Sequence, residues 1–266
     1  CRADVEVRRA QPVLGGRDLA AGGTWMGIGG SGRIGLVTNV RRKGDMRPDA
    51  PSRGALITDW LQQSEAEGAQ VFIDRHADIP YNGYNLLLGD ERGSRWWWTS
   101  NRSVDGDVWL GKVSVELEPG WHGLSNASLD SPWPKSHRLV AALRSAVSRL
   151  QLDRPAGEVS EAEAPSPELV PFVAEMMEAL ADDEIAPDDQ LPATGVPREW
   201  ESRLSSVFVD FRERDYGTRC SSVVVIEHRP DPGGMRRLVH VWERTHATPD
   251  AAQARATPWR QISFAM

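Results

Sequence analysis

The chain has 266 residues, 40% of them hydrophobic, which is enough for a sizeable core and argues against global disorder. Its formal net charge of -7 and its pI near 5.5 argue against binding to a nucleic-acid backbone. Cys1 and Cys220 are the only cysteines, which excludes a disulfide scaffold, and the six histidines are too scattered to suggest a metal site. No apolar run approaches the roughly 20 residues that span a bilayer, and no signal peptide is visible. We therefore expect a cytoplasmic protein with no metal or cofactor.

The first part of the chain is typical of strands and turns. Apolar runs at 22–28 and 33–39 flank a Gly29-Gly30-Ser31-Gly32 turn, which predicts a β-hairpin. Apolar residues at helical spacing predict a helix over 53–66, with Ser52 as its N-cap. Three further short strands are expected at 84–89, 95–99 and 113–117.

The second part of the chain begins with helices and ends with strands. Apolar periodicity predicts one helix from Pro134 to Leu150 and another over 169–180. Between them, residues 153–168 are rich in Pro, Glu and Ala and predict an exposed surface linker that tolerates change. Strands are then expected at 222–227, 238–243 and 261–264. This order favours a layered α+β protein over alternating βαβ units, and we interpret residues 1–266 as a single domain.

Cys1 is the first candidate for chemistry. A chain that begins at cysteine offers a thiol nucleophile and a free α-amine whose pKa of about 8 suits it to accept a proton. The alternative is that position 1 is only where processing ended. The other cysteine, Cys220, is better explained as a small buried residue than as a second nucleophile.

Two polar residues in loops are further candidates. Asn126 lies in a Gly-Leu-Ser-Asn-Ala-Ser stretch, where its amide could donate to an oxyanion during acyl transfer or simply form a turn. Arg219 lies just before an apolar strand, where it could hold a carboxylate, steady a thiolate or form a surface ion pair. Residue types alone leave both sets of alternatives open.

Three consecutive tryptophans, Trp96-Trp97-Trp98, form an unusual string. Strand alternation places Trp97 on the opposite face from the other two. The rings serve either the core or a flat apolar wall for an acyl chain or a porphyrin, and the core is favoured. The Gly-x-Gly-x-x-Gly pattern at 27–32 opens into a strand rather than a helix, so it does not indicate a nucleotide site.

Seven short motifs, in order along the chain, resemble the transport and Golgi organisation protein 2 family, also called NRDE. They are Gly16-Arg17-Asp18-Leu19, Gly22-Gly23-Thr24-Trp25-Met26-Gly27, Thr38-Asn39-Val40-Arg41, Ser52-Arg53-Gly54, Tyr84-Asn85-Leu86-Leu87-Leu88-Gly89-Asp90, Leu124-Ser125-Asn126 with 129–135, and Tyr216-Gly217-Thr218-Arg219. Each motif is weak alone, but seven in order make the resemblance specific.

The resemblance implies a relative of the N-terminal-nucleophile (Ntn) hydrolases, near the penicillin acylase and bile-salt hydrolase group. The implied fold is a four-layer αββα sandwich, with strands around 24–40 and 222–243 in the inner layers. By motif position, Cys1 resembles the nucleophile, Asn126 the oxyanion donor and Arg219 the arginine near the nucleophile. Within or beside the motifs, Trp25, Asn85 and Trp97 are the expected substrate-binding residues.

One segment departs from the family pattern. The family's Asn-Arg-Asp-Glu segment does not occur in this sequence. Arg2 with Asp4, or Arg17 with Asp18, could take the place of its charged pair, although Arg17 and Asp18 already match another motif. We therefore include Asp4, Arg17 and Asp18 as secondary catalytic candidates.

The expected function is hydrolysis of an amide or thioester of a small acyl substrate, or acyl transfer by the same mechanism. This hypothesis predicts that Cys1, Asn126 and Arg219 converge on one pocket. The alternative is a non-enzymatic carrier or chaperone for haem or lipid, a role linked to the family, in which the tryptophans would matter and Cys1 would not. Neither hypothesis involves nucleic acid or a membrane span.

Overall fold

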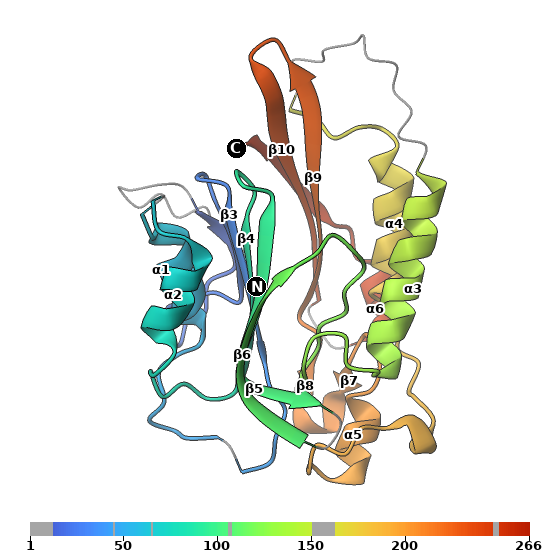
Figure 1. The fold of residues 1–266 in the computed structure, drawn as a ribbon. Helices are drawn as coiled ribbons and strands as arrows, with labels where there is room; N and C mark the ends of the chain where they lie inside the picture. The colour runs from blue at the N-terminus through green and yellow to red at the C-terminus, as the bar shows by residue number, and fades with distance from the viewer. Residues whose placement is uncertain (1–12, 45, 65, 106–107, 151–162, 247–249) are drawn as a thin grey trace. The chain divides into compact units, whose positions relative to one another are not determined.

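The computed structural model describes residues 13–44, 46–64, 66–105, 108–150, 163–246 and 250–266 (Figure 1). The chain divides into two compact units. The first takes the residues up to 131 together with 194–196, and the second takes 132–193 and 197–266. The single domain expected over 1–266 stays a prediction.

The first unit contains a six-stranded antiparallel sheet in which each strand pairs with the next one along the chain. Its strands are β1 (Val13–Gly15), β2 (Met26–Gly29), β3 (Arg33–Asn39), β4 (Tyr84–Asp90), β5 (Arg95–Asp105) and β6 (Val108–Leu117). The predicted hairpin is confirmed, because β2 pairs with β3 across the glycine-rich turn. Gly32 adopts a φ of +86° in that turn, a conformation in which glycine carries no steric cost.

Helices α1 (Gly54–Gln62) and α2 (Ala69–His76) cover one face of this sheet (Figure 1). Their apolar sides pack on alternate residues of the strands, and the resulting core includes Leu56, Ile57, Trp60, Leu61, Phe72, Tyr84, Leu86, Leu88 and Trp97. The helix expected over 53–66 is shorter than predicted, and α2 was not predicted. Ser52 is not the N-cap, which is Arg53 without a side-chain cap bond.

A buried arginine from the sheet stabilises the end of α1. The guanidinium of Arg33 donates to the carbonyls of Trp60 and Gln63 at 3.2 and 2.9 Å, and to those of Ser64 and Glu67 at 2.7 Å each. The Cζ atom of Arg33 also lies 4.5 Å from the centroid of the Trp60 ring. The last carbonyls of a helix lack hydrogen-bond donors within the helix. The Arg33 side chain of β3 supplies donors to these carbonyls at the end of α1.

The second unit is built around a three-stranded antiparallel sheet in the order β11-β10-β9. Its strands are β9 (Cys220–Asp231), β10 (Gly234–Thr245) and β11 (Arg260–Ala265), which confirm and extend the three expected strands. Helices α3 (Pro134–Arg149) and α4 (Leu169–Ala179) lie side by side and share an apolar core with β9 and β10 (Figure 1). Pro134 starts α3 in its first turn, where its missing N–H costs nothing.

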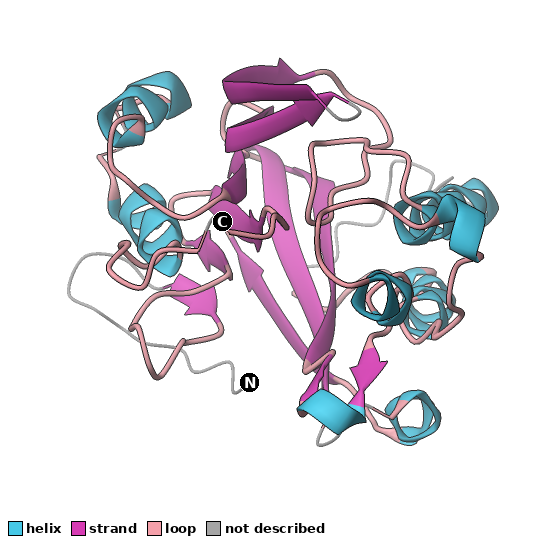
Figure 2. Ribbon diagram, turned by 90° about the horizontal axis from the view of Figure 1, so that it is seen from below, coloured by secondary structure: helices cyan, strands magenta, loops and turns pink. Residues whose placement is uncertain are grey.

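Short elements complete the second unit. They are η1 (Asp188–Gln190), α5 (Arg198–Arg203), β7 (Asp210–Phe211), η2 (Arg212–Arg214), β8 (Tyr216–Gly217) and α6 (Ala251–Ala256), and Figure 2 distinguishes helices from strands by colour. Most of the expected linker, residues 153–162, lies outside the described residues. In the remainder, Glu163, Ala164 and Pro167 are exposed, whereas Ser166 is buried.

The expected mixture of antiparallel sheets and helices is confirmed in both units. Strands β2 and β3 fall within 24–40, and β9 and β10 cover 222–243. Stacking of the two sheets into four αββα layers stays a prediction. Within the described ranges, no helix is both long enough and apolar enough to cross a lipid bilayer.

Candidate functional site

The loop that carries Asn126 is fastened to the ends of β3 and β4 through three consecutive carbonyls. The Thr38 hydroxyl donates to the Ser125 carbonyl at 2.7 Å, and the backbone N–H of Arg41 donates to the Asn126 carbonyl at 2.7 Å. The Asn85 amide donates to the Ala127 carbonyl at 2.8 Å. Since these bonds do not involve the Asn126 side chain, they hold the loop whatever that side chain does.

The side-chain amide of Asn126 has a defined orientation. Its Nδ2 donates to the Asn39 carbonyl at 3.0 Å, while its Oδ1 accepts from Arg41 Nη2 and Ser125 Oγ at 3.4 Å each. Arginine can only donate and a carbonyl can only accept, so the two ends of the amide are fixed by their partners. An amide nitrogen carries two N–H groups, and among the described residues only one of them has a protein acceptor.

Four of the seven family motifs line one cavity of about 550 Å³ in the first unit. Its lining includes Asp18 from the first motif, Trp25 from the second, Asn39 from the third and Arg53 from the fourth. Asn39 is also the residue whose carbonyl accepts from Asn126. The volume falls in the range of roughly 300–1,000 Å³ that is typical of small-molecule sites.

Two glycines allow these motifs to approach closely. A Cβ on Gly23 would lie 2.4 Å from the backbone carbon of Gly54, and a Cβ on Gly16 would lie 2.4 Å from the indole of Trp25. Real Cβ atoms do not make contacts this short, so larger residues would push the second and fourth motifs apart or displace the indole. Both glycines therefore shape the wall of the cavity.

Arg53 supplies a positive charge to the cavity. Its Nη1 donates to the Gly83 carbonyl at 3.1 Å, and among the described residues it has no carboxylate partner. Burial lowers the pKa of this guanidinium from its ordinary value, which reflects the cost of removing its charge from water. The cavity therefore favours a ligand group that carries negative charge or an exposed carbonyl oxygen.

Asp18 builds the turn at the edge of the cavity. Its Oδ1 accepts from the backbone N–H groups of Ala20 and Ala21 at 2.9 and 3.2 Å. Arg17, its neighbour, is exposed and does not line the cavity. These contacts support a structural role for Asp18, and catalytic roles for either residue stay predictions.

An ion pair joins the two ends of the loop that carries Asn126. His122 Nδ1 lies 2.9 Å from Asp130 Oδ2, and Asp130 Oδ1 accepts from the backbone N–H of Gly123 at 2.7 Å. Asp130 has a φ of +57°, a region that aspartate tolerates better than most residues. The bond to Asp130 raises the pKa of His122 above its ordinary value.

The His122 pair should make the loop sensitive to pH. A histidine whose pKa is raised by folding stabilises the fold fully below its unfolded pKa of about 6.5, and this contribution is lost as the pH rises through the folded pKa. We expect the amides of 123–130 to lose protection from hydrogen exchange across that interval, beyond the intrinsic effect of pH. In His122→Gln this extra loss should vanish, and an unchanged pH profile in the variant would contradict the role of the pair.

Two of the expected substrate-binding residues are buried. Asn85 is 0% exposed, and its amide bonds Thr38, Ala127 and Trp98 within the first unit. Trp97 packs in the apolar core that the sheet shares with α1 and α2, which agrees with the core interpretation of the tryptophan string. Burial gives no support to substrate contact by either residue, whereas Trp25 does line the cavity.

The remaining candidates lie elsewhere in the chain. Arg219 is exposed in the second unit, immediately before β9, and its carbonyl accepts from the His246 N–H at 2.8 Å. Cys1 and Asp4 lie outside the described residues. Convergence of Cys1, Asn126 and Arg219 therefore stays a prediction. For Cys220, burial and then the charge of Glu243 raise the pKa of the thiol, which disfavours the nucleophilic thiolate.

Residue types alone did not single out Arg53 or Asn39 as functional candidates. Both lie in quoted family motifs, which is the signal that could have identified them. Among the residues that the structure describes, no group of three or more His, Cys, Asp or Glu side chains is placed to hold a metal ion.

Residues 2–247 match the family described as Transport and Golgi organisation 2. The chain belongs to this family. It is 31% identical over 228 residues to the Transport and Golgi organization protein 2 homolog of Bos taurus, covering 81% of this chain and 72% of that protein. Identity to the Mus musculus homolog is 28% over 229 residues with the same coverage. The Homo sapiens homolog is 32% identical over 132 residues, or 46% of this chain and 44% of that protein.

Among solved structures, the chain resembles penicillin V acylase from Agrobacterium tumefaciens. The match covers 95% of this chain and 70% of the acylase, at 12% sequence identity and a TM-score of 0.38. The four-layer arrangement expected for this family consequently remains a proposal.

Proposed function

We propose that this protein binds a small acyl compound in the 550 Å³ cavity and hydrolyses its amide or thioester bond, or transfers its acyl group. The observation that carries this proposal is the Asn126 amide, which is held rigidly beside the cavity-lining Asn39 with one N–H not bonded to a described residue. A fixed donor of this kind suits the negative charge that develops on a carbonyl oxygen during acyl transfer.

The cavity lining suits an acyl substrate. Trp25 offers an apolar ring for the hydrocarbon part, and Arg53 offers a charged donor for a carboxylate or carbonyl oxygen. Asn39 and Asn82 also line the cavity and add polar groups to it. A concave pocket that combines apolar side chains with a few directed polar groups is the usual form of a small-molecule site.

The proposed nucleophile is the thiol of Cys1. Its thiolate attacks the acyl carbon, a C–S bond forms and the carbonyl oxygen becomes an oxyanion that Asn126 stabilises. Collapse of this intermediate breaks the bond to the leaving amine or thiol, which takes up a proton. Water or an acceptor amine then releases the acyl group from sulfur. If Cys1 is the first residue of the mature protein, its α-amine serves as the proton acceptor, and Arg219 would favour the thiolate.

A direct test is acylation by a short-chain acyl thioester, followed by intact mass and peptide mapping. The intact mass also identifies the mature N-terminus. We expect an adduct on Cys1 that disappears in Cys1→Ser and persists in Cys220→Ser, because the Cys220 thiol has a raised pKa. The matched cysteine variants separate nucleophilic attack from non-specific labelling.

Two outcomes would count against the proposal. An adduct on Cys220 alone would show that Cys1 is not the nucleophile. No adduct on either cysteine, together with tight binding of haem or a lipid, would replace the hydrolase with the carrier hypothesis.

A further inference from the structure

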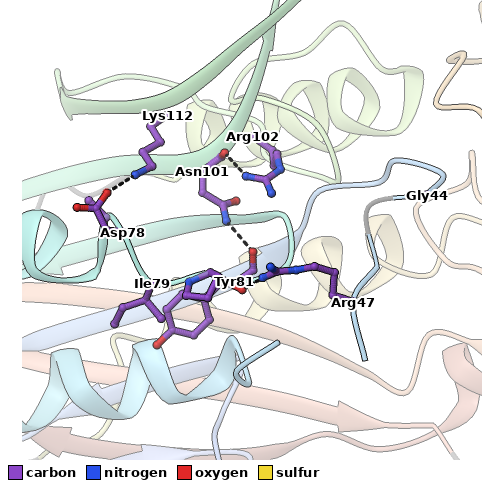
Figure 3. A pocket seen from close by; sticks show the side chains of 10 residues that line it. Gly44, Arg47, Asp78, Ile79, Tyr81, Asn101, Arg102 and Lys112 are labelled. Carbon is purple, nitrogen blue, oxygen red and sulfur yellow. Dashed lines mark hydrogen bonds and ion pairs between the residues drawn. The ribbon is translucent and has the colours of Figure 1, made fainter. Parts of the chain in front are cut away.

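Among the described residues, no histidine lines either of two cavities in the first unit. The smaller of the two, of about 330 Å³, is lined by residues that include Arg47, Asn101 and Lys112 (Figure 3). The described lining of these cavities therefore offers no imidazole base to a hydroxyl nucleophile. The second unit does place a serine, a histidine and a carboxylate in a row, on the sheet of β9, β10 and β11.

Pairing of the strands brings Ser263, His240 and Glu227 to one face of this sheet. Ser263 of β11 lies opposite His240 of β10, and Glu227 of β9 lies two residues from Val225, which is also opposite His240. Ser263 Oγ lies 2.8 Å from His240 Nδ1, and His240 Nε2 lies 2.8 Å from Glu227 Oε2. Either nitrogen of a neutral imidazole can accept a proton while the other carries one. The ring thus lies between a hydroxyl and a carboxylate, as a general base does beside its nucleophile.

The protonation states suit this arrangement. His240 is 0% exposed, and burial lowers the pKa of its imidazole below the ordinary value, which leaves a neutral ring at pH 7. Burial alone would raise the pKa of Glu227, but hydrogen bonds from Ser166 and Arg229 outweigh it and lower that pKa. The Ser166 N–H and Arg229 Nη2 donate to Glu227 Oε2 at 3.2 and 2.5 Å. A neutral base therefore faces an ionised carboxylate.

A side-chain amide lies beside the Ser263 hydroxyl. Gln261 Nε2 donates to Ser263 Oγ at 3.2 Å, and Gln261 Oε1 accepts from Trp242 Nε1 at 3.2 Å. An indole nitrogen can only donate, so its bond fixes which end of the amide faces Ser263. A donor this close to a nucleophile can also reach the oxygen that becomes negative when the nucleophile attacks a carbonyl carbon.

Access distinguishes Ser263 from a second serine–histidine pair. Strand β11 lies at the edge of its sheet, Gln261 is exposed and Ser263 is half-buried. Ser221 Oγ also lies 3.0 Å from His246 Nε2, but both residues are buried, and His246 Nδ1 has no hydrogen-bond partner among the described residues. Of the two pairs, the one at Ser263 combines a reachable hydroxyl with a base that faces a carboxylate.

We propose that Ser263 is the nucleophile of a second acyl-transfer site, which hydrolyses small carboxylic esters. A small ester is favoured because it must reach a half-buried hydroxyl from the edge of the sheet. Glu227 is a positioning residue that orients the His240 ring and stabilises its protonated form.

The reaction follows from these contacts. His240 Nδ1 takes the hydroxyl proton as Ser263 Oγ bonds to the acyl carbon, and Gln261 donates to the oxyanion. Collapse of the intermediate breaks the bond to the alcohol oxygen, which receives the proton from His240. Water then attacks the acyl-serine, which releases the acid and restores the hydroxyl.

An alkyl fluorophosphonate is the probe for the nucleophile, because an activated serine Oγ bonds to its phosphorus and fluoride leaves. Peptide mapping should find the adduct on Ser263 and not on Ser221. The adduct should be absent from Ser263→Ala. Ser148→Ala should label like the wild type, because it removes an exposed hydroxyl that bonds a backbone carbonyl of α3 in the same unit.

Two variants test the groups around the hydroxyl. His240→Gln should label about 10²–10⁴-fold more slowly, because glutamine has no basic ring nitrogen. Gln261→Glu keeps an acceptor for Trp242 but loses the donor, so labelling should slow by at least about tenfold. Because Gln261 is exposed, this variant keeps the test decisive if His240→Gln does not fold.

The pH profile of labelling tests the positioning role of Glu227. The rate should rise as His240 loses its proton, with a midpoint below pH 6.5. The charges of Glu227 and Arg229 act on the ring in opposite senses, since the carboxylate favours its protonated form and the guanidinium disfavours it. Glu227→Gln should therefore move the midpoint lower, and an unchanged midpoint would contradict this role.

The site is overturned if Ser263 takes up no fluorophosphonate, or if His240→Gln and Gln261→Glu both label at the wild-type rate. Ester hydrolysis gives a second readout, with 4-nitrophenyl acetate as the substrate. Hydrolysis should persist in Cys1→Ala and disappear when Ser263→Ala is added. Loss of all hydrolysis in Cys1→Ala alone would assign the ester chemistry to the thiol and overturn the serine site, while the proposed acylation of Cys1 would stand.

Discussion

Replacing Asn126 with alanine is expected to lower kcat for a short-chain acyl thioester by about 10²–10³-fold, with little change in the unfolding midpoint. Removal of one oxyanion donor typically costs about 2.7–4 kcal/mol of barrier. The loop should stay in place, because the acceptors of its three anchoring hydrogen bonds are backbone carbonyls and not the Asn126 side chain. Steady-state kinetics and thermal unfolding of the same preparations measure both effects.

Two neighbouring variants sharpen the Asn126 prediction. Asn126→Asp keeps an acceptor for Arg41 but loses the donor, so its kcat should fall about as far as that of the alanine variant. Ser125→Ala removes only a 3.4 Å bond to Asn126 Oδ1 and should keep most activity. Equal activity in all three variants and the wild type would rule Asn126 out as the oxyanion donor.

Replacing Arg33 with methionine is expected to destabilise the first unit by about 3–5 kcal/mol. The change leaves the carbonyls of Trp60, Gln63, Ser64 and Glu67 without their charged donor at a partly buried helix end. Arg33→Lys should recover only part of this loss, because an ammonium cannot span four carbonyls as a guanidinium does. Urea unfolding followed by tryptophan fluorescence, with hydrogen exchange over 57–64, measures the effect.

Arg95→Gln provides a control in the same sheet. Arg95 pairs with Glu116 on the exposed surface at 2.6 Å, so its loss should shift the unfolding midpoint much less than the loss of Arg33. If Arg33→Met and Arg95→Gln unfold at the same urea concentration, the role of Arg33 at the end of α1 is wrong.

Strand positions were predictable where apolar alternation and turn residues agree. The glycine-rich turn at 29–32 and the apolar runs beside it are local signals, and they correctly predicted β2 and β3. Helix α2 was missed because its 8 residues are too few to display a clear apolar periodicity, and its contacts with the sheet stabilise it. Ser52 was assigned as an N-cap from residue type alone, yet it lines the larger cavity instead.

The candidate site was predictable only as a set of segments. The family motifs identified the stretches that line the larger cavity, because the resemblance selects residues that lie together in the fold. The bond between Asn126 and Asn39 joins residues 87 positions apart, and no sequence spacing encodes such a contact. The Asn85 amide joins β4 to the loop, a contact that depends on the pairing of β3 with β4, and its expected contact with substrate stays a prediction.

The most direct test of the proposed function is a crystal structure of the acyl-enzyme formed with a slowly hydrolysed acyl thioester. We expect a thioester on Cys1, with its carbonyl oxygen about 2.7–3.1 Å from Asn126 Nδ2 and its acyl chain in the cavity beside Trp25 and Arg53. An acyl group bound outside that cavity, or an Asn126 amide turned away from the carbonyl oxygen, would contradict the proposed function.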